Sequence, residues 1–183
     1  MIDDVVRHYE ETLGEPAREG RFKPRGRDEV VWVYKWPAES IGRDVTIYGT
    51  AGASAAAAPP GRSRSEFLVT LHPERDEVAS PLAELAHFPI QERTRLGSGH
   101  TLMLADPLWP GTEMNGFLVV EPGQPLVPAL TTGGGEEVEF LVAIPIFESE
   151  LAFKKAHGVD ALVRRWHEDD VHFDDPRRGP VRT

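Results

Sequence analysis

Hydrophobic positions near the N-terminus follow the spacing of a helix. Val5, Val6, Tyr9 and Leu13 fall on one helical face, and a glycine and a proline follow shortly after them. The pattern predicts a helix over residues 2–13.

β-branched and aromatic runs further along the chain predict strands, because such residues fit a pleated, half-buried surface. The run at 138–146, VEFLVAIPI, is apolar enough for a central buried strand, and three glycines at 133–135 predict a hairpin-like turn before it. The basic stretch 18–27 carries two glycines and a proline and predicts a loop. The predicted strands cover residues 30–34, 44–48, 67–71, 101–104, 117–120 and 138–146.

Three more helices are predicted from end signals and apolar stripes. Ser80 is a suitable N-cap for a helix over 81–88, and Pro89 is expected to end or bend it. Acidic residues open the segment 148–157 and basic residues close it, which complements a helix dipole. After Gly158, a stripe of apolar residues at helical spacing predicts the last helix over 159–166.

These elements predict one domain spanning residues 1–183, of the α/β class and the α+β type. We expect a mixed β-sheet of about five to seven strands packed by three or four helices, and the chain is long enough to bury a core of its own. Residues 50–61, rich in alanine, glycine and proline, predict a flexible loop within the domain. Residues 168–183 predict an acidic and then basic C-terminal tail.

Charge and composition narrow the classes of partner. Acidic residues outnumber basic ones 30 to 20, for a formal net charge of -10, which opposes attraction to nucleic acid and to anionic membranes. The chain has no cysteine and no apolar segment of signal-peptide or membrane-spanning length. We therefore expect a cytoplasmic protein with a protein partner, while its oligomeric state is left open.

Four blocks, taken in order, resemble the bacterial single-domain form of the Suppressor of fused family. They are a strand entering a Gly-Thr-Ala-Gly turn at 46–52, the stretch 80–104, the strand Asn-Gly-Phe-Leu-Val-Val at 115–120, and the strand and helix pair of 138–166. The resemblance implies a mixed α/β domain that binds other polypeptides. Animal members hold a transcription factor in check, and bacterial members look like immunity proteins of toxin systems.

The resemblance leads to the hypothesis of a non-enzymatic immunity protein that neutralises a cognate toxin by stoichiometric binding. A regulatory adaptor for a non-toxin client is the alternative within the same class. We assign no catalytic residue and no cofactor. The candidate partner contacts are Gly97, Gly99 and His100 in a Gly-x-Gly-His turn, Trp109 in a proline-rich loop, and Asp169 with Asp170 in the acidic C-terminal segment.

His100 has three possible roles. In the first, the glycines permit a turn in which the imidazole donates to a nearby carbonyl; in the second, the ring contacts a partner; in the third, it acts in catalysis. The last role has little support, because Ser98 and His100 do not form a nucleophile-elbow pattern.

A metal-assisted hydrolase is the alternative from a different class. The segment 167–175 holds two histidines and five carboxylates, which are metal-ligand types. Its spacing matches neither a His-Glu-x-x-His helix nor an EF-hand loop, so we predict no metal site there, and a solvated acidic segment is the simpler interpretation.

Overall fold

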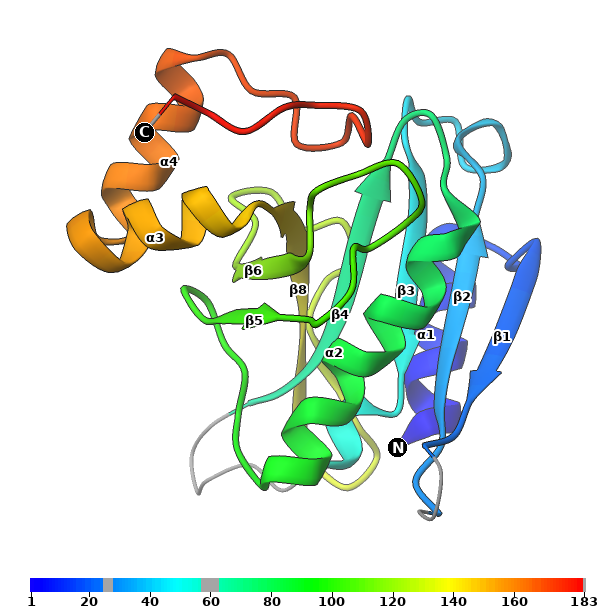
Figure 1. The fold of residues 1–183 in the computed structure, drawn as a ribbon. Helices are drawn as coiled ribbons and strands as arrows, with labels where there is room; N and C mark the ends of the chain where they lie inside the picture. The colour runs from blue at the N-terminus through cyan, green and yellow to red at the C-terminus, as the bar shows by residue number, and fades with distance from the viewer. Residues whose placement is uncertain (25–27, 57–62, 183) are drawn as a thin grey trace.

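A single mixed sheet runs through the computed structural model, which describes residues 1–24, 28–56 and 63–182 (Figure 1). The strand order is β1-β2-β3-β4-β8-β6-β5, and β7 also pairs with β8. The mixed sheet packed by helices confirms the predicted fold class, with β1 and the short β7 added to the expected strands. The strands are Arg18–Phe22 (β1), Val31–Trp36 (β2), Thr46–Ala51 (β3), Arg64–Leu71 (β4), Thr101–Met103 (β5), Gly116–Val120 (β6), Leu130–Thr131 (β7) and Glu137–Ile146 (β8).

The strand β8 is interior to the sheet, as predicted for its apolar sequence. It pairs in parallel with β4, where Phe67 lies opposite Leu141, and antiparallel with β6 and β7. The other pairs are antiparallel. The glycines at 133–135 join β7 to β8 in a hairpin, as their sequence predicts.

Helices cover both faces of the sheet (Figure 1). Helix α1 (Ile2–Leu13) matches its predicted bounds and packs on one face, and α2 (Ala79–Glu92) crosses the other. Helices α3 (Glu148–His157) and α4 (Val159–Glu168) follow β8 and pack together beyond its end. Among the described residues there are also three short 3-10 turns: η1 (Ala38–Ser40), η2 (Ala53–Ala55) and η3 (Asp76–Val78).

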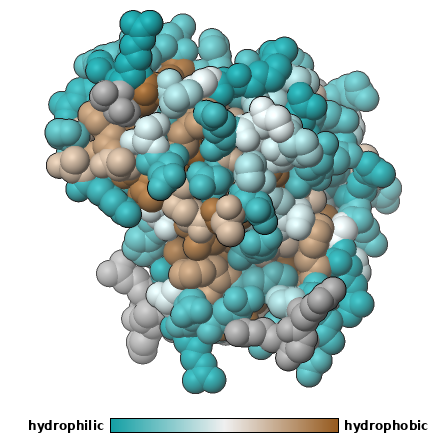
Figure 2. All heavy atoms as spheres, in the orientation of Figure 1, coloured by the Kyte–Doolittle hydropathy of each residue, from teal (hydrophilic) through white to brown (hydrophobic). Residues whose placement is uncertain are grey.

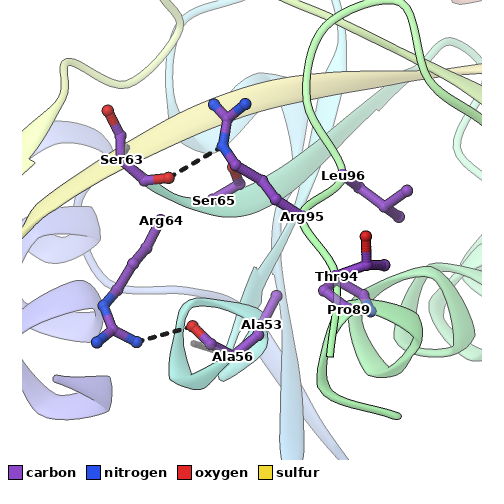
Figure 3. A pocket seen from close by; sticks show the side chains of 9 residues that line it. All are labelled: Ala53, Ala56, Ser63, Arg64, Ser65, Pro89, Thr94, Arg95 and Leu96. Carbon is purple, nitrogen blue, oxygen red and sulfur yellow. Dashed lines mark hydrogen bonds between the residues drawn. The ribbon is translucent and has the colours of Figure 1, made fainter. Parts of the chain in front are cut away.

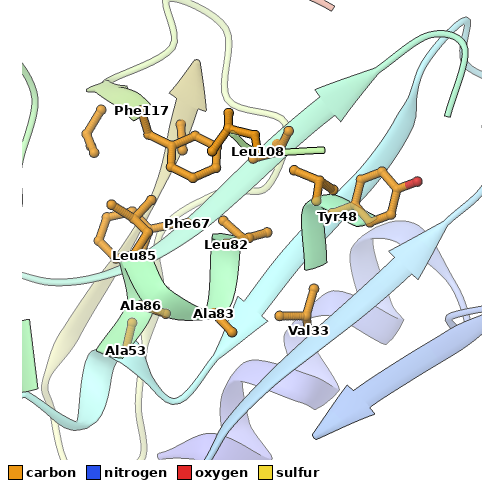
Figure 4. Close-up of a cluster of buried hydrophobic side chains, with 14 of the residues drawn as sticks. Val33, Tyr48, Ala53, Phe67, Leu82, Ala83, Leu85, Ala86, Leu108 and Phe117 are labelled. Carbon is orange, nitrogen blue, oxygen red and sulfur yellow. The ribbon is translucent and has the colours of Figure 1, made fainter. Parts of the chain in front are cut away.

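The core beneath α2 is the largest hydrophobic cluster (Figure 4). Leu82 and Leu85 of α2 pack against Tyr48, Phe67 and Phe117 of the sheet, and all five are at most 1% exposed. Burying side chains of this size stabilises the fold by roughly 1.5–3 kcal/mol each. Helix α2 is therefore firmly seated, and its opposite face is available to solvent.

The turn after β3 requires glycine. Gly52 has a φ of 130°, and a Cβ there would lie 2.7 Å from the carbonyl oxygen of Val30. Its backbone N–H, with those of Ala53 and Ser54, donates to the carboxylate of Glu66 on β4. The predicted loop over 50–61 therefore begins as the end of β3 and the η2 turn, while residues 57–61 lie outside the described residues.

The basic stretch 18–27 was predicted to be a loop, and this prediction is wrong for residues 18–22, which form β1. Arg18 lies opposite Lys35 and Phe22 opposite Val31 in an antiparallel pair. Pairing with the apolar β2 outweighs the tendency of this charged sequence to form a loop. Charged side chains are also typical of an edge strand, which has a side open to solvent.

The predicted bounds of α2 are also wrong at both ends. The η3 turn leads directly into the helix, so Val78 is the N-cap and Ser80 lies inside the first turn. Pro89 does not end the helix, which continues to Glu92. The lost backbone hydrogen bond at Pro89 is tolerated because Leu85, Ala86 and Pro89 are all buried in the core contact.

Residues 169–182, which follow α4, pack back onto α3 and α4. Val181 is buried in the third hydrophobic cluster with Leu162 and Trp166. Arg178 forms two hydrogen bonds with the fully buried Glu150, and the backbone N–H of His72 donates to the carbonyl of Asp174. This segment is a docked part of the fold.

Candidate functional site

The solvent-facing side of α2 forms the floor of a groove. Ser80, Glu84, His87 and Gln91 succeed one another along this side at helical spacing. They line a hollow of about 360 Å³, together with Phe22 at the end of β1 and Leu102 and Leu104 at β5. The hollow therefore lies along α2, and residues from the two edge strands of the sheet help to line it (Figure 1).

A second hollow, of about 470 Å³, adjoins the first near the N-terminal end of α2. The two share Ser80, Glu84 and Leu104, so we treat them as one feature, the α2 groove. Residues 104–111, which follow β5, line the second hollow opposite α2. A groove of this kind fits an extended or helical segment of another polypeptide.

The lining of the α2 groove combines polar side chains of α2 with apolar side chains from α2, from β1 and from the segment at β5. Phe22, Phe88, Leu102 and Leu104 are partly buried and pack against the core below. Figure 2 shows hydrophobic side chains on this face of the molecule, surrounded by hydrophilic ones. Large apolar residues of the described chain are nowhere fully exposed, so the groove offers apolar contact only to a segment that enters it.

His87 is the most buried titratable residue of the groove. It is 5% exposed, and its Nδ1 lies 2.8 Å from the carbonyl oxygen of Ala83, one turn earlier in α2. A carbonyl accepts only, so in the neutral imidazole Nδ1 is the donor and Nε2 is left as an acceptor. Nε2 is buried without a hydrogen-bond partner, which is costly for an imidazole nitrogen.

A polar network supports the N-terminal end of α2 from β2 and η3. Asp76 accepts hydrogen bonds from Lys35 and Arg18, each at 2.6 Å, and from Tyr48 at 3.0 Å. Burial opposes ionisation of Asp76, but these donors outweigh it and lower the pKa of its carboxyl. Burial would also lower the pKa of Lys35, and the hydrogen bonds to Asp76 and Glu74 raise it instead. Lys35 is thus held as a charged structural group.

A much smaller hollow, of about 20 Å³, lies between η2, β4 and the end of α2 (Figure 3). Arg64 donates to the carbonyls of Ser54 and Ala56, and Arg95 donates to the carbonyl of Ser63. The same two arginines pair with Glu136 and Glu139. Their donors tie neighbouring segments together, and the hollow has little room for a ligand.

The buried carboxylate of Glu66 has a structural role next to this hollow. It accepts a hydrogen bond from Thr50 Oγ1 at 2.6 Å, in addition to the three N–H groups of the turn after β3. Burial raises the pKa of Glu66, and the hydrogen bonds only partly oppose this shift.

The predicted contact residues Gly97, Gly99 and His100 have partners within the fold. His100 is exposed, and its Nδ1 accepts a hydrogen bond from the N–H of Gly97 instead of donating to a carbonyl. The N–H of Gly99 donates to Val119, and its carbonyl accepts from Lys154 of α3. The turn thereby joins β6 to α3, and its contact with a partner stays a prediction.

The other predicted contacts lie in different places. Trp109 is only 4% exposed, packs in the core beneath α2 and lines the second hollow. Asp169 and Asp170 are exposed at the end of α4, away from the α2 groove (Figure 1). The structure thus brings Trp109 to the groove and leaves the two aspartates outside it.

The histidines and acids of 167–175, on which the hydrolase alternative depends, do not gather into a metal-binding group. Within residues 1–24, 28–56 and 63–182, histidine, aspartate and glutamate side chains form no group of three suited to a metal ion. Asp175 instead forms an ion pair with Arg177, which lowers the pKa of its carboxyl. The same described part of the chain has no helix long and apolar enough to cross a bilayer.

Comparison with known proteins decides the family. The family model described as Suppressor of fused protein matches residues 28–179, which is most of the chain. This chain belongs to the Suppressor of fused family. A search of curated proteins returned no match.

Solved Suppressor of fused structures share the fold. A homolog from Neisseria gonorrhoeae superposes with a TM-score of 0.74 at 20% identity, covering 99% of this chain and 96% of the homolog. The Sufu–Fu complex gives a TM-score of 0.68 at 16% identity, covering 98% and 90%. Drosophila Suppressor of Fused gives 0.63 at 16% identity, and the match covers 92% of this chain but 46% of the Drosophila chain.

Sequence reasoning missed the α2 groove and the buried acids Glu66 and Glu150. The polar residues at 80, 84, 87 and 91 share one side of a helix whose other side is apolar, and this pattern was the available signal for the groove. Each glutamate directly follows a serine and directly precedes an apolar residue, and this local sequence does not mark either carboxyl group as buried.

Proposed function

We propose that this Suppressor of fused domain is a non-enzymatic immunity protein that neutralises a cognate toxin by stoichiometric binding. The observation that carries the proposal is the α2 groove, a long surface hollow in which polar side chains of α2 lie beside partly buried apolar side chains. The Sufu–Fu complex is a structure of a relative together with another protein, which supports binding as the mode of action.

The groove is suited to recognition because its floor is rigid. Leu82 and Leu85 seat α2 on the sheet, and the network of Lys35 and Asp76 supports its first turn. A preformed surface loses less conformational entropy on binding than a mobile one. The partner supplies a segment whose shape complements the groove. A specific protein interface buries roughly 800 Å² of surface on each side, so the contact extends beyond that segment.

The chemistry of the groove favours binding over catalysis. Ser80 is the hydroxyl residue common to both hollows, and no hydrogen bond among the described residues joins it to a histidine or a carboxylate. An activated serine nucleophile needs such a base within hydrogen-bond reach. His87 in turn directs its one proton to a backbone carbonyl of its own helix.

The negative charge suits the proposed role. A net charge of -10 accelerates encounter with a basic partner and has less effect on the lifetime of the complex. Action inside the cell is consistent with the lack of cysteine, and a cytoplasmic location stays a prediction.

The test is to co-express the chain with the product of the adjacent reading frame and to measure complex formation and cell survival. We expect a 1:1 complex by light scattering and protection from that product. Ser80→Trp, which fills the groove, should abolish both, whereas Glu11→Trp on the exposed side of α1 should leave both intact. Binding without any toxicity to relieve would favour the adaptor alternative, and no binding would refute the proposal.

A further inference from the structure

The second hollow of the α2 groove is lined by acidic and apolar side chains. Glu77, Glu84 and Asp106 are all exposed and stand around it, and no lysine, arginine or histidine lines it. Its remaining lining is mostly apolar: Pro81, Leu104, Ala105, Pro107, Leu108, Trp109 and Pro110.

These three carboxylates differ from several other acids of the described surface. Asp76 pairs with Lys35 and Arg18, Glu136 with Arg64, and Glu139 with Arg95. In contrast, Glu77, Glu84 and Asp106 form no ion pair within the described part of the chain. No cation of the described part of the chain is therefore paired with any of the three.

The adjoining hollow carries a second group without a partner. His87 Nε2 is an acceptor, is buried and has no hydrogen bond, and the residue lines the hollow that shares Glu84 with the acidic one. The second hollow thus presents exposed carboxylates and no cation of its own. A polypeptide with a cationic side chain pairs with these carboxylates, whereas an acidic segment adds repulsion.

We infer that the α2 groove binds a segment of the partner in which a lysine or arginine lies between apolar residues. The cationic side chain lies among Glu77, Glu84 and Asp106, and the flanking apolar residues lie on Leu104 and Pro107. This inference rests on the proposed function and names the chemistry of the partner that the groove selects. An arginine fits best, because its planar guanidinium pairs with more than one carboxylate at a time.

The inference is tested with the full chain and a phage-displayed library of random dodecapeptides, selected at low salt. Enriched peptides are synthesised, and their affinities are measured by fluorescence anisotropy. We expect enrichment of arginine or lysine next to leucine, phenylalanine or valine. Because the contact is partly exposed, we expect affinity to weaken on raising the salt from 20 to 300 mM, by about tenfold.

Charge-reversal variants localise the contact. Glu84→Lys and Asp106→Lys should each weaken the selected peptides by about tenfold at low salt, because each replaces an attraction by a repulsion. Glu11→Lys, on α1 across the sheet, makes the same charge change at an exposed helical site and should have little effect. The thermal midpoints of the three variants should match, since each position is exposed.

Several results would overturn the inference: selection of acidic or uncharged peptides, no peptide above background, or equal loss in Glu11→Lys. Self-association abolished by Glu84→Lys would also overturn it, because the occupant would then be a second copy of this chain. The proposed function fails separately. If the adjacent gene product binds the chain and its affinity is unchanged by Glu84→Lys and Asp106→Lys, the immunity proposal is retained and the inferred partner chemistry is wrong.

Discussion

Arg178 near the C-terminus reaches across to Glu150 at the start of α3 and forms two hydrogen bonds with its carboxylate, at 2.7 and 2.9 Å. Glu150 is fully buried, and it also accepts from Trp166 Nε1 and from the N–H of Phe147. The guanidinium lies over the rings of Phe147 and Trp166. One ion pair thus holds the docked C-terminal segment, α3 and α4 together.

Removing Arg178 should destabilise the protein strongly, because it leaves a buried carboxylate without a counter-charge. We expect Arg178→Ala to lower the free energy of unfolding by about 3–5 kcal/mol, measured by urea denaturation. The neighbouring Arg177→Ala removes an exposed ion pair with Asp175, which solvent screens, and should change the free energy of unfolding very little. Equal losses for the two arginines would contradict this role of Arg178.

Glu66 should make stability depend on pH in a direction unusual for a carboxylate. Its pKa is raised by burial above the ordinary value of 4.5, so the folded state binds the proton more tightly than the unfolded state. Its contribution is therefore most favourable below about 4.5 and diminishes as the pH rises through the folded-state pKa.

The neutral variant Glu66→Gln isolates this effect. Relative to wild type, its unfolding free energy should improve as the pH rises from 4 towards neutrality, measured by urea denaturation at a series of pH values. Glu121→Gln, at an exposed site, should show no such trend. A pH-independent difference for Glu66→Gln would argue against a raised pKa.

Asp76 should show the opposite dependence. Its pKa is lowered from 3.8 by its donors against the effect of burial, so its contribution is present above about 3.8 and is lost as the pH falls through the folded-state value. We expect Asp76→Asn to cost about 1–2 kcal/mol at pH 7, allowing for the partial exposure of Asp76, and progressively less in acid. Thermal melts at pH 7 and pH 3 provide the measurement, and a larger loss at pH 3 would refute it.

Gly52 should not tolerate a side chain. Its positive φ and the proximity of Val30 predict that Gly52→Ala lowers the unfolding free energy by more than about 1 kcal/mol. Gly133→Ala is the matched control, because a Cβ at Gly133 meets no atom within 4 Å and φ is not positive there. Denaturant titration measures the loss of unfolding free energy in each variant. Similar losses in the two variants would contradict the requirement for glycine at position 52.

Helices and central strands were predictable because their patterns are local. The bounds of α1 follow from Val5, Tyr9 and Leu13, and β8 follows from a run of apolar residues too long for a surface segment. The family, and with it the fold, followed from the order of four such blocks.

The elements that sequence reasoning missed depend on distant partners. β1 is a strand because β2 lies beside it, and Pro89 stays helical because the core holds its turn in place. The groove arises where α2 passes between β1 and the loop after β5, which are far apart in the sequence. Of the predicted contacts, Trp109 reaches the groove because its core packing carries residues 104–111 to α2.

The parallel pairing of β4 with β8 has a consequence for synthesis and folding. β4 ends at Leu71 and β8 begins at Glu137, so a nascent chain that has emerged only as far as β6 leaves one side of β4 without its neighbour. Such long-range pairing slows folding, and an open strand edge invites association with other chains. Truncation before β8 should therefore yield aggregates, and the last third of the chain completes the sheet.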